Sequence, residues 1–185
     1  MTFRIGNTEL TARFGFFAVL AVMLCLDGGA HVLPAMLACA VHESGHIGMA
    51  RLCGMRIEAV RLSALGIQMV GDARALSHLR RAAVSLAGPL SNLLAFALLL
   101  PLPREYCAVQ LLLFLFHILP AVPLDGGMAL RHLADGRFTR LLNGIAGVSV
   151  LVLLAGGVLL WKSGFGGWLF LAGLIVAACN PHAHA

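Results

Sequence analysis

Charged residues are what this sequence has least of. Only 11% of its 185 residues are charged, with eight acids in all, and 60% of the residues are hydrophobic. Soluble domains carry about 25% charged and roughly 45–50% apolar residues, so the composition excludes an ordinary soluble protein and predicts an integral membrane protein. The length fits a single domain, residues 1–185, and leaves no room for a large soluble module.

Paired cysteines are also missing. The five cysteines form no C-x-x-C motif and all lie in or beside apolar segments, so we expect them to be small packing residues. Internal repeats, low-complexity linkers and runs of charge are absent from the sequence as well. The formal charge of +5 might suggest a nucleic-acid partner in a soluble protein, but the positions of the basic residues explain it better, and we expect no nucleic acid.

Long hydrophobic runs stand in place of charge. A helix needs roughly 20 apolar residues to span a bilayer, and six segments approach this length, although the first and last are short. The sequence therefore predicts an all-α polytopic membrane protein with six transmembrane helices. The segments are 14–26, 32–52, 82–100, 108–130 with prolines inside, 141–161 and 165–179.

The first apolar segment also has the pattern of a signal peptide. Arg4 and Arg13 precede an apolar core, and Gly28-Gly29-Ala30 follows it as a small-x-small cleavage pattern. We expect a retained helix, on the strength of the family resemblance described below.

One segment between the second and third spans has no helical period. Residues 56–73 contain the short β-branched and apolar pieces RIEAVRL and GIQMV around a glycine. This pattern predicts a small β-hairpin at the cytoplasmic face of the membrane.

The basic residues gather on one side of the predicted spans. With six spans and a cytoplasmic N-terminus, eleven of the thirteen basic residues lie in cytoplasmic pieces, and only Arg104 and Lys162 lie outside. This bias follows the positive-inside rule. It predicts a multi-pass protein of the bacterial cell membrane with both termini in the cytoplasm.

One motif carries metal chemistry. Residues 42–46 read HESGH, an H-E-x-x-H pattern inside an apolar segment. On a helix, His42 and His46 project from one face, so their imidazoles can share one zinc ion, and Glu43 is placed to accept a proton from a water molecule there. The alternative is a hydrogen-bonded histidine pair without metal, but a glutamate buried beside such a pair would be costly.

Asp125 is the candidate third ligand. A catalytic zinc usually has three protein ligands, and Glu43 and Asp125 are the only two of the eight acids that fall within predicted spans. Asp125 lies between two prolines and two glycines in 120-PAVPLDGG-127. Broken backbone at membrane depth is tolerated where it is buried in protein or lines a wet cavity, so a mere kink is an insufficient explanation.

The two candidate sites lie at a similar predicted depth. At helical rise His46 is about 7–8 Å from Arg51, the basic residue that ends its segment, and Asp125 is about 9 Å from Arg131. Both segments run from outside to inside. The active site is therefore predicted in the cytoplasmic half of the membrane.

The motifs HESGH, 87-AGPLSN-92 and 120-PAVPLDGG-127, in this order, resemble those of the site-2 protease family of intramembrane zinc metalloproteases. The layout is most similar to the compact sporulation branch, which cleaves a sigma-factor precursor. The resemblance implies that His42, His46 and Asp125 bind one zinc ion per chain and that Glu43 is the catalytic acid/base. The PDZ or CBS domain that many members carry is not found in this sequence.

His117 and Asn92 are the candidate contacts to the substrate or the oxyanion. The family usually has Asn at the position of His117, eight residues before the aspartate, where it is thought to make such a contact. An imidazole also donates a hydrogen bond, with a pH dependence that Asn would lack; a satisfied core histidine and a competing zinc ligand are the alternatives. Asn92 shares its motif with Gly88 and Pro89, which from the residues alone predict close packing and an interhelical hydrogen bond.

The sequence thus predicts an intramembrane zinc metalloendopeptidase. The resemblance implies a membrane-tethered regulatory protein as substrate, a sigma-factor precursor or anti-sigma factor, and regulatory membrane partners. The predicted hairpin would hold the unwound substrate as an added strand. One alternative is a membrane metal transporter, which should place polar residues at successive depths on several spans. The other is a catalytically silent membrane scaffold, which the filled catalytic positions disfavour.

Overall fold

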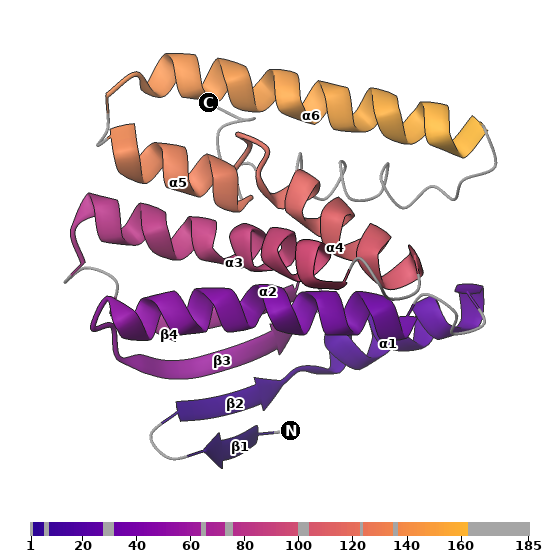
Figure 1. Ribbon diagram of the computed structural model, residues 1–185, viewed down its shortest axis with the longest axis horizontal. Helices are drawn as coiled ribbons and strands as arrows, with labels where there is room; N and C mark the ends of the chain where they lie inside the picture. The colour runs from indigo at the N-terminus through magenta and orange to yellow at the C-terminus, as the bar shows by residue number, and fades with distance from the viewer. Residues whose placement is uncertain are drawn as a thin grey trace. The chain divides into compact units, whose positions relative to one another are not determined.

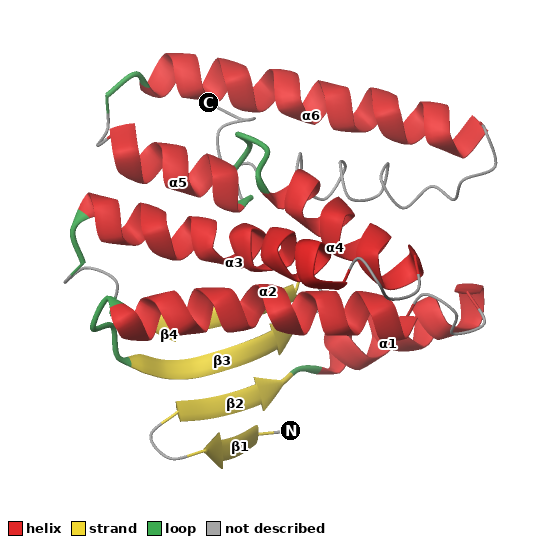
Figure 2. Ribbon diagram, viewed as in Figure 1, coloured by secondary structure: helices red, strands yellow, loops and turns green. Residues whose placement is uncertain are grey.

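The computed structural model describes residues 2–5, 8–27, 32–63, 66–72, 76–99, 104–122, 124–134 and 137–162. Backbone contacts divide the chain into two units, Met1–Phe114 and Leu115–Ala185. The fold is mostly helical with one small sheet (Figures 1 and 2). Its elements are β1 (Thr2–Ile5), β2 (Thr8–Ala12), α1 (Phe14–Asp27), α2 (Val32–Leu52), β3 (Ile57–Ser63), β4 (Gly66–Gly71), α3 (His78–Leu99), α4 (Arg104–His117), α5 (Asp125–Ala134) and α6 (Thr139–Lys162).

The sheet of the first unit is larger than the sequence predicted. The hairpin expected within 56–73 is confirmed as the antiparallel pair β3–β4. However, the strand order is β1-β2-β3-β4, because an N-terminal antiparallel hairpin adds to it through a parallel pairing of β2 with β3. The prediction of a lone hairpin was therefore wrong. The missed signal is Gly6-Asn7, a turn-type dipeptide between two short threonine-containing runs.

A turn at Gly54 ends α2 and connects it to the sheet. Gly54 has a φ of 84°, and the N–H groups of Gly54 and Met55 bond back to the carbonyls of Arg51 and Ala50 at 2.9 Å each. This is the pattern of a Schellman cap, which glycine favours because it has no Cβ to clash in the left-handed conformation. The chain then enters β3 directly, and Ala50, Met55, Ile57 and Leu76 form a buried cluster there.

Helices α2 and α3 lie side by side in the first unit (Figure 1). Gly45 of α2 lies so close to α3 that a Cβ added there would meet the Ser91 hydroxyl and the Ala87 carbonyl. Gly88 of α3 lies against the imidazole ring of His46 on α2. Small residues at such a crossing let two backbones approach closely, and this approach brings the polar side chains of the two helices into contact.

The predicted spans agree with the helices at most positions. The first, second and fifth apolar segments match α1, α2 and α6 to within two residues, and the third overlaps α3 over 82–99. The sixth predicted segment, 165–179, lies outside the described residues. Within the described part of the chain, one helix, His78–Leu98, is long and apolar enough to cross a membrane, and Tyr106–His117 is a shorter apolar helix.

The predicted fourth span is not one helix. Helix α4 ends at His117 and α5 begins at Asp125, as the two prolines between them in the sequence indicated. In the second unit, the Leu119 N–H bonds to the Phe116 carbonyl, and the Leu124 N–H bonds to the Ala121 carbonyl at 2.7 Å. Ala121 and Leu124 are buried against Ala146 of α6, so the non-helical segment is packed within the protein.

Candidate functional site

The two histidines of HESGH face each other on α2. His42 is only 3% exposed, and its ring meets that of His46 edge to face, with centroids 4.7 Å apart. The Nε2 atoms of the two rings are 3.0 Å apart. The four-residue spacing of the motif explains this, because residues i and i+4 lie one above the other on a helix face.

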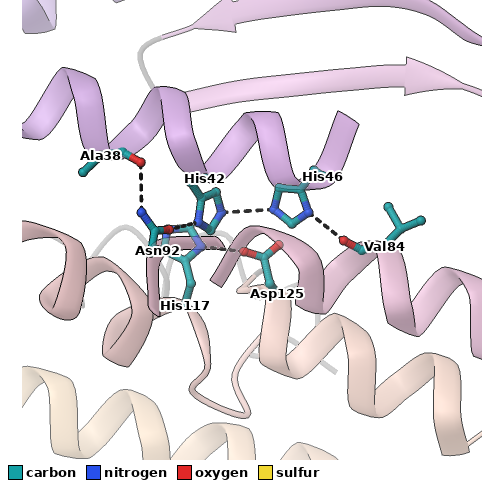
Figure 3. Close-up of polar contacts among 7 residues, drawn as sticks. All are labelled: Ala38, His42, His46, Val84, Asn92, His117 and Asp125. Carbon is teal, nitrogen blue, oxygen red and sulfur yellow. Dashed lines mark hydrogen bonds and ion pairs between the residues drawn. The ribbon is translucent and has the colours of Figure 1, made fainter. Parts of the chain in front are cut away.

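The other nitrogen of each ring is held by helix α3 (Figure 3). The Nδ1 atom of His46 is 2.7 Å from the backbone carbonyl oxygen of Val84, and that of His42 is 2.7 Å from Oδ1 of Asn92. A carbonyl oxygen only accepts hydrogen bonds, so Nδ1 of His46 must carry the proton. The Asn92 Nδ2 group donates to the Ala38 carbonyl at 3.0 Å, which leaves Oδ1 as acceptor and gives His42 the same tautomer.

The two Nε2 atoms therefore face each other. With the proton on Nδ1, a neutral imidazole presents a lone pair at Nε2. Two lone pairs at 3.0 Å repel unless a positive charge, a metal ion or a shared proton, lies near both. In a tetrahedral zinc site with Zn–N bonds of about 2.0–2.1 Å, two nitrogens are about 3.3 Å apart. The histidine pair thus fits a metal ion, with both tautomers set by outer acceptors as ligating histidines require.

Gly88 makes room for the second ring. A Cβ built on Gly88 would overlap the imidazole of His46, with Cδ2 and Cε1 both at 2.7 Å. Pro89 and Asn92 are the largest fully buried side chains among the described residues. The close packing expected of 87-AGPLSN-92 is confirmed. As a consequence, α3 contacts the rings of both histidines.

Glu43 lies beside this pair on α2. It follows His42 directly in the chain, but it is only half-buried whereas His42 is fully buried. Its side chain is therefore partly accessible. This is the exposure that an acid/base group needs.

In the second unit, Asp125 is paired with His117. Oδ2 of Asp125 is 2.7 Å from Nδ1 of His117 (Figure 3), and the two side chains are 20% and 28% exposed respectively. The non-helical segment between α4 and α5 brings them together. Asp125 is the first residue of α5, where the positive end of the helix dipole favours a negative charge.

Two glycines make this arrangement possible. A Cβ on Gly126 would meet the Ile118 carbonyl oxygen, and one on Gly127 would lie 2.5 Å from the Ala121 carbonyl carbon. The start of α5 therefore packs directly onto the backbone that precedes it. Larger residues at either position would push Asp125 away from His117.

Among solved structures, this chain is similar to the site-2 protease from Methanocaldococcus jannaschii. The TM-score is 0.66 and the sequence identity 21%, over 97% of this chain and 93% of that one. The fold is that of a site-2 protease. No family model matches the sequence, and neither does any curated protein.

In this site-2 protease fold, Asn92 has a clear structural role. It is fully buried, and its amide contacts His42, the Ala38 carbonyl and the side chain of Gln110. These contacts favour holding His42 over touching a substrate. The substrate contacts predicted for Asn92 and His117 stay predictions.

One buried polar residue beside the candidate site escaped sequence reasoning. Gln110 of α4 is 3% exposed, and its Oε1 accepts a hydrogen bond of 2.6 Å from Nδ2 of Asn92. The signal available was a single amide within an otherwise apolar helix, because such a side chain must find a polar partner there. The sequence did not show that the partner would be Asn92.

Proposed function

We propose that this protein is an intramembrane zinc metalloprotease. The observation that carries the proposal is the pair of Nε2 atoms on His42 and His46 that face each other 3.0 Å apart, with both Nδ1 atoms held by acceptors. The likeness of the fold to a site-2 protease supports the same conclusion.

We propose Asp125 as the third ligand of one zinc ion per chain. Together His42, His46 and Asp125 offer two imidazole nitrogens and a carboxylate oxygen, which is the donor set of a common class of catalytic zinc site. Its hydrogen bond to His117 is the kind of outer contact that orients a ligating carboxylate. Bound zinc would supply Lewis acidity and promote ionisation of water at neutral pH.

The chain's own residues would then perform the proton transfers. We assign to Glu43 the removal of the proton from the attacking water and its return to the leaving amine. Its half-buried position supports this role. The buried His42 and Asn92 stay fixed during the reaction, because their polar atoms are already engaged with each other.

We further propose that both termini and the active site are on the cytoplasmic side. The N-terminal strands and the β3–β4 hairpin belong to one sheet, although α1 and α2 separate them in sequence. This supports two helices that leave one side and return to it. The positive-inside bias supports the cytoplasm as that side.

The substrate we propose is a membrane-tethered regulatory protein, such as a sigma-factor precursor or an anti-sigma factor. The support for this class, and for the sporulation branch and its regulatory membrane partners, is the motif resemblance alone. The sheet refines the strand-addition idea, because β3 is paired on both sides. An unwound substrate would add to β4, the edge strand of the hairpin.

Co-expression with a candidate membrane-tethered substrate tests the proposal. The wild-type chain should cleave it, and Glu43→Gln should abolish cleavage while retaining one zinc. Glu58→Gln, which removes a carboxylate from an exposed position on β3, is the matched control and should cleave normally. Unchanged processing by Glu43→Gln would exclude this mechanism. Equal zinc content without any cleavage by the wild type would favour the transporter or scaffold alternatives.

A further inference from the structure

Gln110 reaches the histidine pair through Asn92. Its Oε1 accepts the Asn92 Nδ2 group at 2.6 Å, and the Asn92 Oδ1 atom lies 2.7 Å from Nδ1 of His42. Gln110 and Asn92 are 3% and 0% exposed, and His42 is 3% exposed. Three buried side chains from three helices therefore form one hydrogen-bonded chain that ends on a candidate ligand.

The direction of the Asn92 amide decides the tautomer of His42. In the observed direction, the NH2 group meets two acceptors and the oxygen meets His42. A reversed amide would turn its oxygen toward the Ala38 carbonyl and the Gln110 Oε1 atom, and neither can donate a hydrogen to it in the observed arrangement. The reversed amide would also present N–H to Nδ1 of His42, which would favour the proton on Nε2 and remove the lone pair that binds a metal.

Two oxygen atoms accept from the Asn92 amide, and the Gln110 Oε1 atom makes the shorter of the two hydrogen bonds. The Ala38 carbonyl lies four residues before His42 on α2 and is the normal acceptor for the backbone N–H of His42 in an α-helix. This carbonyl oxygen therefore accepts from two donors. Its hydrogen bond from Asn92 is 3.0 Å long, whereas the one from Asn92 to Gln110 is 2.6 Å long. Without Gln110, only the Ala38 carbonyl, which also accepts from a backbone N–H, would hold the Asn92 amide in its observed direction.

We propose that Gln110 is a positioning residue of the metal centre. Its Oε1 atom fixes the Asn92 amide, and through that amide the Nδ1–H tautomer of His42, so that Nε2 is available as a ligand. This role deepens the proposed function and rests on it for the metal, whereas the hold on the His42 tautomer exists without metal. Substitutions of residues that support a metal ligand typically weaken metal affinity about 10- to 100-fold.

The first experiment uses the full-length chain, metal-free and in detergent micelles. Nitrogen-15 NMR of labelled histidines in alkaline buffer reports which ring nitrogen of His42 carries the proton, with the signal assigned by a His42→Ala spectrum. The wild type and Gln110→Glu, which keeps an acceptor, should show Nδ1–H. Gln110→Met, close in shape but without a strong acceptor, should show a reduced Nδ1–H fraction. Gln110→Leu serves the same test if the Met variant does not accumulate.

The second experiment measures zinc affinity by competition with a chelator. Gln110→Met should bind about 10- to 100-fold more weakly, and Gln110→Glu should stay close to wild type. In an Asn92→Ala background, Gln110→Met should cause no further loss, because residues that act through one another are non-additive. Cys107→Ala, at a buried position one turn earlier on α4, measures the effect of truncating another buried side chain of the same helix.

An unchanged tautomer and affinity in Gln110→Met would overturn the proposal, as would an equal loss in Cys107→Ala. An additive loss in the Asn92→Ala background would also overturn it. A wild-type chain that binds no zinc at all would refute the proposed function instead, and the metal-free NMR comparison would still decide whether Gln110 fixes the His42 tautomer.

Discussion

Adding one methyl group at Gly88 should disable the proposed metal centre. In Gly88→Ala the new Cβ would lie 2.7 Å from both Cδ2 and Cε1 of His46, whereas carbon atoms in contact are about 3.5–4.0 Å apart. The ring must retreat by about 1 Å, or α2 and α3 must separate by as much. Ligand distances in metal sites are held to about ±0.2 Å, so either response takes His46 out of range.

The expected loss is at least about 10- to 100-fold in zinc affinity, the range seen when the surroundings of a ligand are disturbed, with cleavage lost in proportion. Global stability should change less, because overpacking costs about 1–3 kcal/mol while replacing a helical glycine by alanine gains about 1 kcal/mol. The signature is therefore a metal defect larger than the folding defect.

Gly48→Ala provides the matched control. It adds the same methyl group to a helix two residues after His46, at a position where nothing lies within 4 Å of the new Cβ. Zinc affinity should stay at the wild-type value there. The reasoning fails if Gly88→Ala binds zinc and cleaves like wild type, or if both variants lose affinity equally.

Three further predictions follow from other parts of the structure. His117→Leu removes the hydrogen bond to Asp125 and should lower zinc affinity about 10- to 100-fold, whereas His117→Asn, which can still donate, should lose less; equal affinities by chelator competition would count against this role. Alternate N–H groups of a strand point to opposite edges, so either Met69→Pro or Val70→Pro in β4 removes an N–H that points away from β3. That variant should stay folded but cleave the substrate more slowly. Cleavage by both variants at the wild-type rate would rule out strand addition at β4. Zinc at 100 times its Kd should stabilise the wild type by about 2.7 kcal/mol, which is measured as a higher unfolding temperature. Glu43→Gln should show the same rise and His46→Ala should show none. An equal rise in His46→Ala would mean that zinc binds elsewhere.

Much of the site was predictable because it depends on local rules. The i, i+4 spacing of His42 and His46 sets two rings on one face of any helix, and the prolines before Asp125 interrupt a helix. Both features appear in the structure as predicted. The hairpin β3–β4 was also predictable, since short β-branched pieces around a glycine have few other solutions.

The remainder depends on which helices become neighbours, and that is not written in local sequence. Asn92 could be placed near the site only through a family motif, and its bond to His42 arises from the close packing of α2 on α3. Gln110 needed the same knowledge of a third helix. The N-terminal strands were missed because four- and five-residue strands are marginal alone and gain their stability from pairing with β3.

The central claim is that His42 and His46 bind zinc through their Nε2 atoms with Asp125 as the third protein ligand. X-ray absorption at the zinc edge, measured on the purified full-length chain together with its zinc content, tests this directly. The account predicts one zinc per chain, surrounded by nitrogen and oxygen donors with two imidazoles, and loss of that zinc in His42→Ala and in Asp125→Ala. Sulfur donors in the spectrum, or full zinc content in His42→Ala, would contradict it.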